Sequence, residues 1–207
     1  MIDSSILNWQ KSPDELLPVI VQDCDTAQIL MLGYMNREAL EETLKTKLVT
    51  FYSRSKERLW QKGETSGNVL QFVSCTSDCD KDAILIRARP KGPTCHTGTQ
   101  SCFGDEELPV ETVGQLIRTI TDRASSGGST SYTKKLLDGG IEACGAKVLE
   151  EAEEVVRAAK EEGEQRTVEE AADLLYHLLV LLQEKEIQLS AVAEELMQRR
   201  SGGNAEE

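Results

Sequence analysis

The chain has 207 residues, which suits one large domain or two small ones, and hydrophobic residues make up 39% of it, enough to bury aliphatic cores. The formal net charge of −13 disfavours a general binder of nucleic acids or of anionic membranes, because either would need a basic surface. A phosphorylated small molecule remains compatible with this charge, since bound Mg²⁺ bridges acidic side chains to phosphates.

The first half of the chain predicts β-strands that alternate with turns. Six segments rich in Val, Ile, Leu and aromatic residues are separated by Gly, Asn and Asp. These segments cover residues 16–23, 27–35, 49–55, 58–64, 68–78 and 83–90. One helix interrupts them, with Asn36 as its N-cap. The pattern predicts an α+β domain built on a mostly antiparallel sheet.

The second half predicts helices, because apolar residues recur there every three or four positions. We expect helices over residues 110–124, 133–140, 141–163, 167–186 and 188–200, with a loop at 125–131. Gly163 is expected to end one helix. Thr167 is expected to cap the next, since Glu170 follows it as in a capping box. The sequence therefore predicts two domains, 1–108 and 109–207, of which the second is all-α.

The sequence shows no sign of export or of a membrane span. No apolar stretch is long enough to cross a bilayer as a helix, and residues 1–15 lack the basic start and apolar run of a signal peptide. We therefore expect a cytoplasmic protein whose six cysteines are reduced, so clustered cysteines indicate metal binding or catalysis. Cys24 and Cys144 are isolated and are expected to be ordinary small apolar residues.

Acidic and sulfur ligands gather in DCDKDAILIRARPKGPTCHTGTQSC, residues 78–102. If the start of this segment is extended, Asp78, Asp80 and Asp82 share one face and Cys79 points to the other. Carboxylates suit Mg²⁺ and thiolates suit Zn²⁺. This spacing predicts two metal sites on opposite sides of one strand.

Three cysteines of this segment, Cys79, Cys95 and Cys102, offer thiolates to zinc and leave a fourth position for water, as in a catalytic site. Zinc lowers the pKa of a bound water toward about 7, and His96 beside Cys95 is placed to move the proton. Two alternatives stay open. Cys75 would close a four-cysteine structural site, or the aspartates would belong to a solvated turn without metal.

DCDKD and GPTCHTGTQSCF, with FYSRSKERLWQKGETSGN upstream, resemble phosphoribosyl-AMP cyclohydrolase of histidine biosynthesis over roughly residues 15–105. The resemblance implies hydrolytic opening of the adenine ring between N1 and C6, much as zinc deaminases attack their bases. It implies Mg²⁺ on the three aspartates, and zinc in a homodimer between Cys79 of one chain and Cys95 and Cys102 of the other. Cys75 falls outside this ligand set, which favours the open catalytic site.

The upstream motif offers substrate contacts. Arg54 is a candidate for a phosphate, and Trp60 is a candidate to stack on the base. The loop that follows offers backbone N–H groups and hydroxyls to a phosphate or ribose. Its candidate residues are Gly63, Thr65, Ser66, Gly67 and Asn68. The alternative is a surface hairpin with a half-buried tryptophan.

Carboxylates on two predicted helices form a second constellation. Glu150, Glu151 and Glu154 lie within about one turn, and Glu170 and Asp173 are three apart on the next helix. Antiparallel helices would aim these groups at one or two Mg²⁺ ions, which neutralise a polyphosphate and activate water, with Glu151 and Glu154 as the catalytic carboxylates. Such runs are usually solvated, but apolar sequence follows Asp173, so we expect its carboxylate to face an interior and to need a cation.

KVLEEAEEVVRAAK followed by VEEAADLLYHLLVLL resembles phosphoribosyl-ATP pyrophosphohydrolase, a MazG-like all-α nucleotide pyrophosphatase, over about residues 112–200. The family pattern, ExxE followed by ExxD, matches Glu151 and Glu154 and then Glu170 and Asp173. Glu150 matches an extra glutamate of the family. A weaker resemblance to the family's substrate loop covers Ser131, Tyr132, Thr133 and Lys134.

The two resemblances imply one bifunctional enzyme for consecutive steps of histidine biosynthesis. The second half would split phosphoribosyl-ATP into phosphoribosyl-AMP and pyrophosphate, and the first half would then open the ring. Zn²⁺ and Mg²⁺ are the implied cofactors, phosphoribosyl nucleotides the partners, and a homodimer the implied assembly. The alternatives are a general nucleotide pyrophosphatase and a zinc-stapled dimerisation module without catalysis.

Overall fold

The computed structural model describes residues 4–104, 106, 109–125 and 131–202. The chain forms two compact units, Met1–Gly114 and Gln115–Glu207. The expected domain boundary beside Leu108 and most of the expected loop, residues 126–130, lie outside the described residues. No helix within the described ranges combines the length and apolarity needed to cross a membrane.

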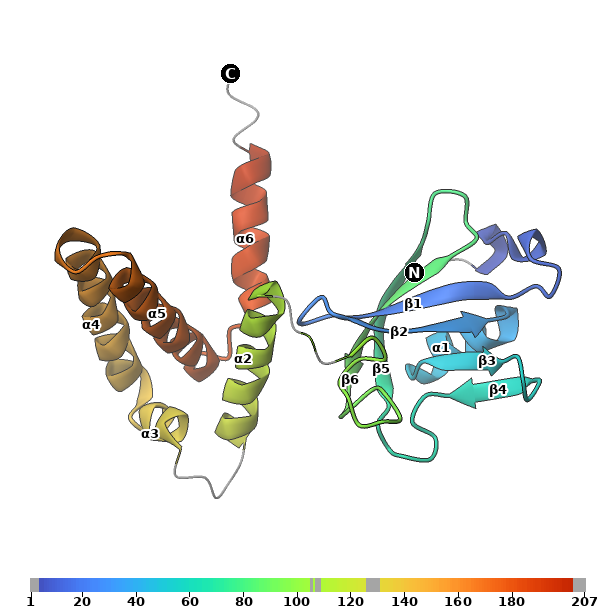
Figure 1. Ribbon diagram of the computed structural model, residues 1–207, viewed down its shortest axis with the longest axis horizontal. Coiled ribbons are helices and arrows are strands. Elements are labelled where there is room, and N and C mark those ends of the chain that lie inside the picture. The colour runs from blue at the N-terminus through green and yellow to red at the C-terminus, as the bar shows by residue number, and fades with distance from the viewer. Residues whose placement is uncertain (1–3, 105, 107–108, 126–130, 203–207) are drawn as a thin grey trace. The chain divides into compact units, whose positions relative to one another are not determined.

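The N-terminal unit contains the six predicted strands and the predicted helix (Figure 1). The elements are β1 (Leu17–Asp23), β2 (Ile29–Met35), α1 (Arg37–Thr46), β3 (Thr50–Ser53), β4 (Arg58–Gln61), β5 (Leu70–Ser77) and β6 (Ile84–Pro90), preceded by two 3₁₀ turns, η1 (Ser4–Ile6) and η2 (Trp9–Lys11). Four strands form a sheet in the order β2-β1-β6-β5, and β3 and β4 form a separate hairpin. The predicted α+β architecture is therefore confirmed.

Strand pairing in the larger sheet is antiparallel except at its centre. β2 runs antiparallel to β1, with Met35 opposite Leu17, and β5 runs antiparallel to β6. β1 and β6 are parallel, with Val19 opposite Ile84. Parallel strands need a long connection. Here that connection contains β2, α1, the β3–β4 hairpin and β5, and it brings the first and last strands of the N-terminal unit together.

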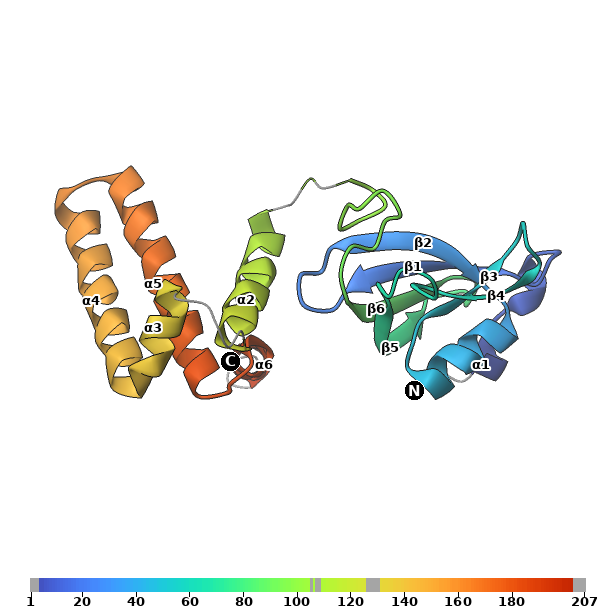
Figure 2. The ribbon, with the colours of Figure 1, turned by 90° about the horizontal axis from the view of Figure 1, so that it is seen from below.

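One face of the sheet carries the core. Leu17, Val19 and Val21 alternate with more exposed residues along β1, as expected for a strand buried on one side. Helix α1 and strand β3 pack on this buried side, where they contribute Leu40 and Phe51 (Figure 2). The predicted N-cap of α1 is confirmed, because the Asn36 side chain accepts a hydrogen bond from the Ala39 backbone N–H at 2.8 Å.

The C-terminal unit is helical, as predicted. Its helices are α2 (Pro109–Ser125, whose first residues belong to the N-terminal unit), α3 (Tyr132–Asp138), α4 (Gly140–Glu161), α5 (Glu164–Glu184) and α6 (Leu189–Gly202). Helices α4 and α5 form an antiparallel hairpin and α3 packs against both (Figures 1 and 2). The hairpin brings the two groups of predicted carboxylates onto neighbouring helices.

The predicted start of α5 is wrong by one turn. The helix begins at Glu164, directly after Gly163, and Thr167 lies inside it. Gly163 has φ of 99°, a conformation that favours glycine, and this turn leads straight into the helix. The Thr167 hydroxyl donates to the Gly163 carbonyl at 2.9 Å as a residue of the first turn, so the apparent capping box is not one.

Candidate functional site

The aspartate motif forms a turn, and the expectation of an extended strand is wrong. Strand β5 ends at Ser77, and Lys81 has φ of 63°. The Asp78 carboxylate accepts hydrogen bonds from the backbone N–H groups of Asp82 at 3.0 Å and Ala83 at 3.1 Å. This side chain therefore closes the turn, as aspartates commonly do.

The turn nevertheless gathers the three predicted aspartates. One carboxylate oxygen from each of Asp78, Asp80 and Asp82 lies within 4.8 Å of the others. The Lys11 ammonium forms ion pairs with Asp80 and Asp82, and these hydrogen bonds raise the pKa of Lys11 above its ordinary value. Three hard oxygen donors fit a divalent cation such as Mg²⁺, and Lys11 now supplies a positive charge to the same carboxylates.

Two of the predicted zinc ligands lie in the loop after β6. The Thr97 hydroxyl donates to the Cys95 sulfur at 3.0 Å, and this hydrogen bond is the main cause that lowers the pKa of Cys95 to about 6. Burial, and then the Cys95 thiolate, raise the pKa of Cys102. The Cys102 backbone N–H donates to the Leu30 carbonyl at 2.8 Å, which fixes the loop to β2. The Cys95 sulfur is therefore ready to bind a metal as a thiolate.

Cys79 lies apart from this pair. Among the described residues of a single chain, Cys79, Cys95 and Cys102 form no group of three metal ligands. Cys79 and Cys102 are exposed, and His96 places its Nδ1 3.8 Å from the Cys95 sulfur. Cys75 is half-buried and packs against the core.

Lys62 is a residue of this region that sequence reasoning missed. Its side chain is buried, and its ammonium donates to the Asn68 carbonyl at 3.4 Å. Burial lowers the pKa of Lys62, while the charges of Cys102 and Cys95 act in the opposite direction. A lysine in a polar hairpin is normally exposed, so nothing in the local sequence indicates that Lys62 is buried.

The two predicted substrate residues upstream, Arg54 and Trp60, each pack against an aromatic ring. The Arg54 guanidinium lies over the Tyr34 ring, 3.7 Å from its centroid. This stacking leaves the edge of the guanidinium for a phosphate. Trp60 is half-buried, and its ring centroid lies 5.6 Å from that of Phe51 at an interplanar angle of 30°.

The predicted glycine-containing loop is a tight turn. Gly63 has φ of 84°, and a Cβ there would lie 2.4 Å from the Asn68 carbonyl oxygen, so this position requires glycine. Thr65, Ser66 and Gly67 are exposed. The Ser66 hydroxyl accepts from the Asn68 backbone N–H at 3.2 Å. The loop thus offers exposed backbone and hydroxyl groups on a fixed frame.

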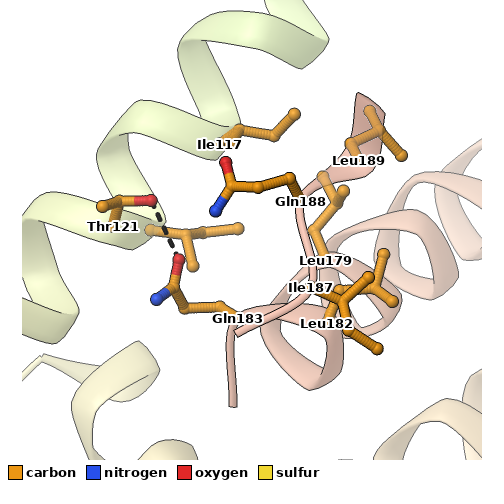
Figure 3. Close-up of a pocket in the computed structure, with 9 residues that line it drawn as sticks. Ile117, Thr121, Leu179, Leu182, Gln183, Ile187, Gln188 and Leu189 are labelled. Carbon is orange, nitrogen blue, oxygen red and sulfur yellow. Dashed lines mark hydrogen bonds between the residues drawn. The ribbon is translucent and has the colours of Figure 1, made fainter. Parts of the chain in front are cut away.

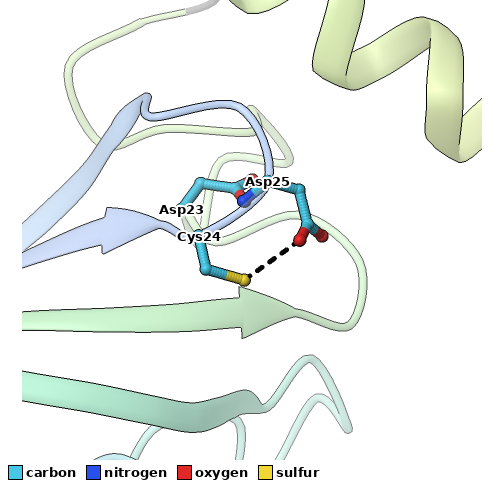
Figure 4. Close-up of side chains that lie close together, drawn as sticks. All are labelled: Asp23, Cys24 and Asp25. Carbon is cyan, nitrogen blue, oxygen red and sulfur yellow. Dashed lines mark hydrogen bonds between the residues drawn. The ribbon is translucent and has the colours of Figure 1, made fainter. Parts of the chain in front are cut away.

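A third acidic cluster, in the turn after β1, is internally compensated (Figure 4). The Asp23 carboxylate accepts from the Asp25 backbone N–H at 2.9 Å, and the Cys24 thiol donates to the Asp25 carboxylate at 3.2 Å. Arg89 donates to the same carboxylate at 2.9 and 3.0 Å. Burial raises the pKa of Cys24 to about 11. Cys24 is thus a hydrogen-bonded part of the turn and not the simple apolar residue expected from its isolation.

In the helical unit, three of the predicted carboxylates converge. Oxygens of Glu151 and Glu154 on α4 and of Glu170 on α5 lie within 4.8 Å of one another. Glu151 is 5% exposed and Glu170 is 1% exposed. Burial raises the pKa of Glu170, Arg166 opposes this shift, and the neighbouring carboxylates reinforce it. Carboxylates this close, two of them buried, repel one another unless positive charge balances them, so the donor set fits Mg²⁺.

Glu150 and Asp173 lie outside this group and are exposed. The expectation that Asp173 faces an interior is wrong for a single chain, because this side of the α4–α5 hairpin is open to solvent. Basic side chains pair with the carboxylates. Lys147 contacts Glu150 and Glu151 at 2.9 Å each, and Arg166 pairs with the buried glutamate of α5.

The predicted substrate loop lies at the start of α3. Ser131 is the N-cap, because its hydroxyl accepts from the Lys134 backbone N–H at 3.2 Å. Tyr132 is half-exposed and stacks on Tyr176 of α5, with ring centroids 6.3 Å apart. Thr133 is fully buried, and its hydroxyl is hydrogen bonded to that of Tyr176 at 2.8 Å. Tyr132 is therefore the exposed residue of the loop, whereas Thr133 supports the loop from inside.

A small cavity elsewhere in this unit is unrelated to the carboxylates (Figure 3). It lies between α2, the end of α5 and the start of α6, and most of its lining is apolar. The Thr121 hydroxyl donates to the Gln183 side chain at 2.9 Å across it. None of the lining residues is charged, so the cavity is a packing feature and not a candidate site.

The comparisons with known proteins assign both units. A family model described as phosphoribosyl-AMP cyclohydrolase matches residues 31–104, and one described as phosphoribosyl-ATP pyrophosphohydrolase matches residues 113–200. Histidine biosynthesis bifunctional protein HisIE of Photobacterium profundum is 47% identical over 201 residues, which cover 94% of this chain and 97% of the relative.

Proteins of the same name in other bacteria give similar results. That of Escherichia coli K12 is 49% identical over 193 residues, covering 93% of this chain and 95% of the relative, and that of Vibrio cholerae is 48% identical, covering 93% of each. The chain therefore belongs to the family of bifunctional histidine-biosynthesis hydrolases, in which a phosphoribosyl-AMP cyclohydrolase is joined to a phosphoribosyl-ATP pyrophosphohydrolase.

Proposed function

We propose that the two hydrolytic reactions occur in the cytoplasm at two separate metal sites, one in each unit, and that the ring-opening site is shared between the chains of a homodimer. The boundary between the two enzymes lies at residues 108 and 109 in this proposal. The observation that carries it is the placement of the ligands: the carboxylates of the helical hairpin converge within one chain, whereas the cysteines do not.

For ring opening, Cys79 of one protomer and Cys95 and Cys102 of its partner would hold zinc. Bound zinc supplies an activated water at neutral pH. His96, next to Cys95, would accept the proton that a water molecule loses as its oxygen adds to C6 of the adenine ring. His96 would then give the proton to N1 as the bond between C6 and N1 breaks. The lowered pKa of Cys95 supports its role, because only the thiolate is a ligand.

The nucleotide is held by the residues around this centre. Arg54, stacked on Tyr34, binds a phosphate with its free edge, and Trp60 stacks on the base. The loop after β4 binds ribose or phosphate through its backbone and hydroxyl groups. These loop residues are Gly63, Thr65, Ser66, Gly67 and Asn68. The aspartate turn, Asp78, Asp80 and Asp82, holds Mg²⁺.

For pyrophosphate release, Mg²⁺ would be held by Glu150, Glu151, Glu154, Glu170 and Asp173. Bound Mg²⁺ neutralises the triphosphate and activates the attacking water. Glu151 and Glu154 would orient a water molecule for attack on the phosphorus whose bond to pyrophosphate breaks. The substrate loop, Ser131, Tyr132, Thr133 and Lys134, borders the same carboxylates, and its lysine is placed to contact phosphate.

The homodimer is supported by an apolar patch on the sheet of the N-terminal unit. Ile20 and Leu32 are direct partners across β1 and β2, and both are exposed, at 39% and 48%. Leu85 lies beside Ile20 in the parallel pair and extends the patch. A face of this kind is stabilised by a second copy, which also brings the missing thiol to the zinc site.

One experiment separates the two sites. Purified protein receives phosphoribosyl-ATP, Mg²⁺ and trace Zn²⁺, and pyrophosphate release and the ultraviolet change of ring opening are followed together. Cys95→Ser or Cys102→Ser, or a zinc-selective chelator, should abolish ring opening alone. Glu151→Gln or Asp173→Asn should abolish pyrophosphate release and leave ring opening of added phosphoribosyl-AMP intact. A single cysteine change that stops both reactions in a folded, dimeric protein would refute the two-site proposal.

A further inference from the structure

His177 is a buried imidazole in the helical unit to which the proposed reaction gives no role. It is 5% exposed and lies on α5, one turn after Asp173. Its Nδ1 lies 2.9 Å from the Asp173 carbonyl oxygen, and its Nε2 lies 3.0 Å from the Tyr132 hydroxyl. Both ring nitrogens are therefore engaged, one with its own helix and one with the substrate loop at α3.

When the imidazole of His177 is neutral, the chemistry of its partners fixes the direction of each hydrogen bond. A carbonyl oxygen only accepts, so Nδ1 of His177 carries the proton and donates it to Asp173. In the neutral imidazole Nε2 is then an acceptor, and the Tyr132 hydroxyl donates to it. This arrangement engages the hydroxyl proton of Tyr132 in a bond directed into the protein, so the residue presents its ring to solvent.

The ring of Tyr132 is held on one side and open on the other. One face stacks on Tyr176, at an interplanar angle of 21°, and the His177 ring meets Tyr132 edge-on at 85°. Tyr176 is itself fixed through its hydroxyl by the buried Thr133. Tyr132 nevertheless remains 52% exposed, so its open surface is the face turned away from Tyr176. The result is a rigid aromatic surface with few side-chain torsions left to order.

This surface is coupled to the carboxylate cluster through the same histidine. Nδ1 of His177 lies 3.6 Å from the carboxylate of Glu151, which belongs to the group of three convergent glutamates. The negative charges of Glu151 and Glu150 and the positive charge of Lys147 also act on the Tyr132 hydroxyl. An aromatic ring beside a site for a metal-bound triphosphate suits a ligand that carries a planar base on that phosphate chain.

We propose that Tyr132 is a stacking platform for the purine base of phosphoribosyl-ATP, and that His177 is the positioning residue that holds this platform beside the carboxylates. The inference rests on the proposed function of the helical unit, because it assumes that the triphosphate is bound at Glu151, Glu154 and Glu170. It assigns the base-binding surface of that reaction to this pair.

The test measures pyrophosphate release by the full-length protein at steady state. Tyr132→Leu should raise KM for phosphoribosyl-ATP about tenfold, the lower part of the range for one base stacked on an aromatic ring, with kcat nearly unchanged. Inhibition by inorganic tripolyphosphate, which has no base, should be the same in both proteins. Tyr132→Phe keeps the ring and should raise KM less, which guards against a leucine variant that does not fold.

Substitutions at His177 test the positioning role. His177→Leu should raise KM as Tyr132→Phe does, and the two changes together should be no worse than either alone, because both remove the same hydrogen bond. His177→Gln should recover much of the loss, since its side-chain oxygen can accept from the tyrosine hydroxyl. A merely structural role would be neither rescued by glutamine nor cancelled in the double variant.

Two outcomes would overturn the inference. One is a fall in kcat at unchanged KM in Tyr132→Leu, which would place the residue in the chemical step. The other is an equal weakening of tripolyphosphate inhibition, which would mean that the carboxylate cluster itself is disturbed. Glu151→Gln separates this failure from that of the proposed function: if it keeps full activity the site is wrong, whereas a wild-type KM in Tyr132→Leu beside an inactive Glu151→Gln refutes only the platform.

Discussion

Replacing Gly33 by alanine should destabilise the N-terminal unit through one steric contact. A Cβ at this position of β2 would lie 2.5 Å from Cδ1 and 2.6 Å from Cε1 of Phe51, whereas ordinary contacts begin at 3.4 Å. The ring therefore has to recede by about 0.9 Å. Phe51 is 1% exposed and lies within the core, so it has little room to move.

The expected loss is about 2 kcal/mol of unfolding free energy, in the range found when extra methyl groups are forced into packed cores. The φ angle of Gly33 is not positive, so alanine brings no backbone strain, and its better strand propensity offsets less than about 1 kcal/mol. For a domain of this size, the melting temperature should fall by roughly 10 °C.

The assay is denaturation of the full-length protein followed by tryptophan fluorescence. Both tryptophans, Trp9 and Trp60, lie in the N-terminal unit, so the signal reports on that unit. Because Phe51 packs on Trp60, the change should also raise KM for ring opening and leave pyrophosphate release unaffected. Adding Phe51→Leu to Gly33→Ala should remove the clash, so the double variant should be no less stable than Phe51→Leu alone.

A matched control lies in the other unit. A Cβ at Gly145 of α4 meets nothing within 4 Å, so Gly145→Ala should leave the tryptophan transition unchanged and stabilise the helix by about 0.5–1 kcal/mol. An unaltered tryptophan transition in Gly33→Ala, or equal effects of both glycine substitutions on it, would refute the packing argument.

Three further predictions concern the sites and a helix end. Lys11→Met should increase the affinity of the aspartate turn for Mn²⁺ about two- to fivefold in calorimetric titration, because it removes a competing cation at an exposed ion pair; unchanged affinity would contradict this. Without metal, the stabilising contribution of Glu170 should be fully present below the ordinary glutamate pKa of 4.5 and be lost as pH rises through its raised pKa; Glu170→Gln should remove this part of the pH dependence in thermal melts, and Mg²⁺ should oppose the loss. Asn36→Ala should cost the N-terminal unit about 1 kcal/mol by tryptophan-detected unfolding, whereas no loss would mean that the cap bond is dispensable.

Local pattern was sufficient to predict the elements of the fold. Each strand was visible as a segment rich in Val, Ile, Leu or aromatic residues, and Asn36 marked the start of α1 correctly. The parallel pairing of β1 with β6 was not predictable in this way, because it joins residues more than sixty positions apart and leaves no mark in either strand. Thr167 was wrongly predicted as the cap, because a capping-box pattern carries no information about the positive φ of Gly163, which directly precedes the helix.

In the candidate sites too, local pattern predicted some features, and tertiary packing determined the others. The aspartates come together as their spacing suggested, but through a turn, because a period of two was assumed for a segment in which Lys81 has a left-handed conformation. Asp173 was expected in an interior because apolar residues follow it, yet only tertiary packing decides which face of α5 is covered. The contact between Tyr132 and His177 joins residues 45 positions apart, so no local pattern announces it.

The family match to the cyclohydrolase begins at residue 31, inside β2, whereas the folded sheet places β1 between β2 and β6. A protein trimmed to the matched segment would lack a central strand, and it would expose the hydrogen-bonding edge of β6 that β1 covers. Open edges of this kind invite aggregation. The segment that identifies the family is thus shorter than the segment that can fold. A gene fragment meant for expression has to begin before Leu7, because its side chain belongs to the core.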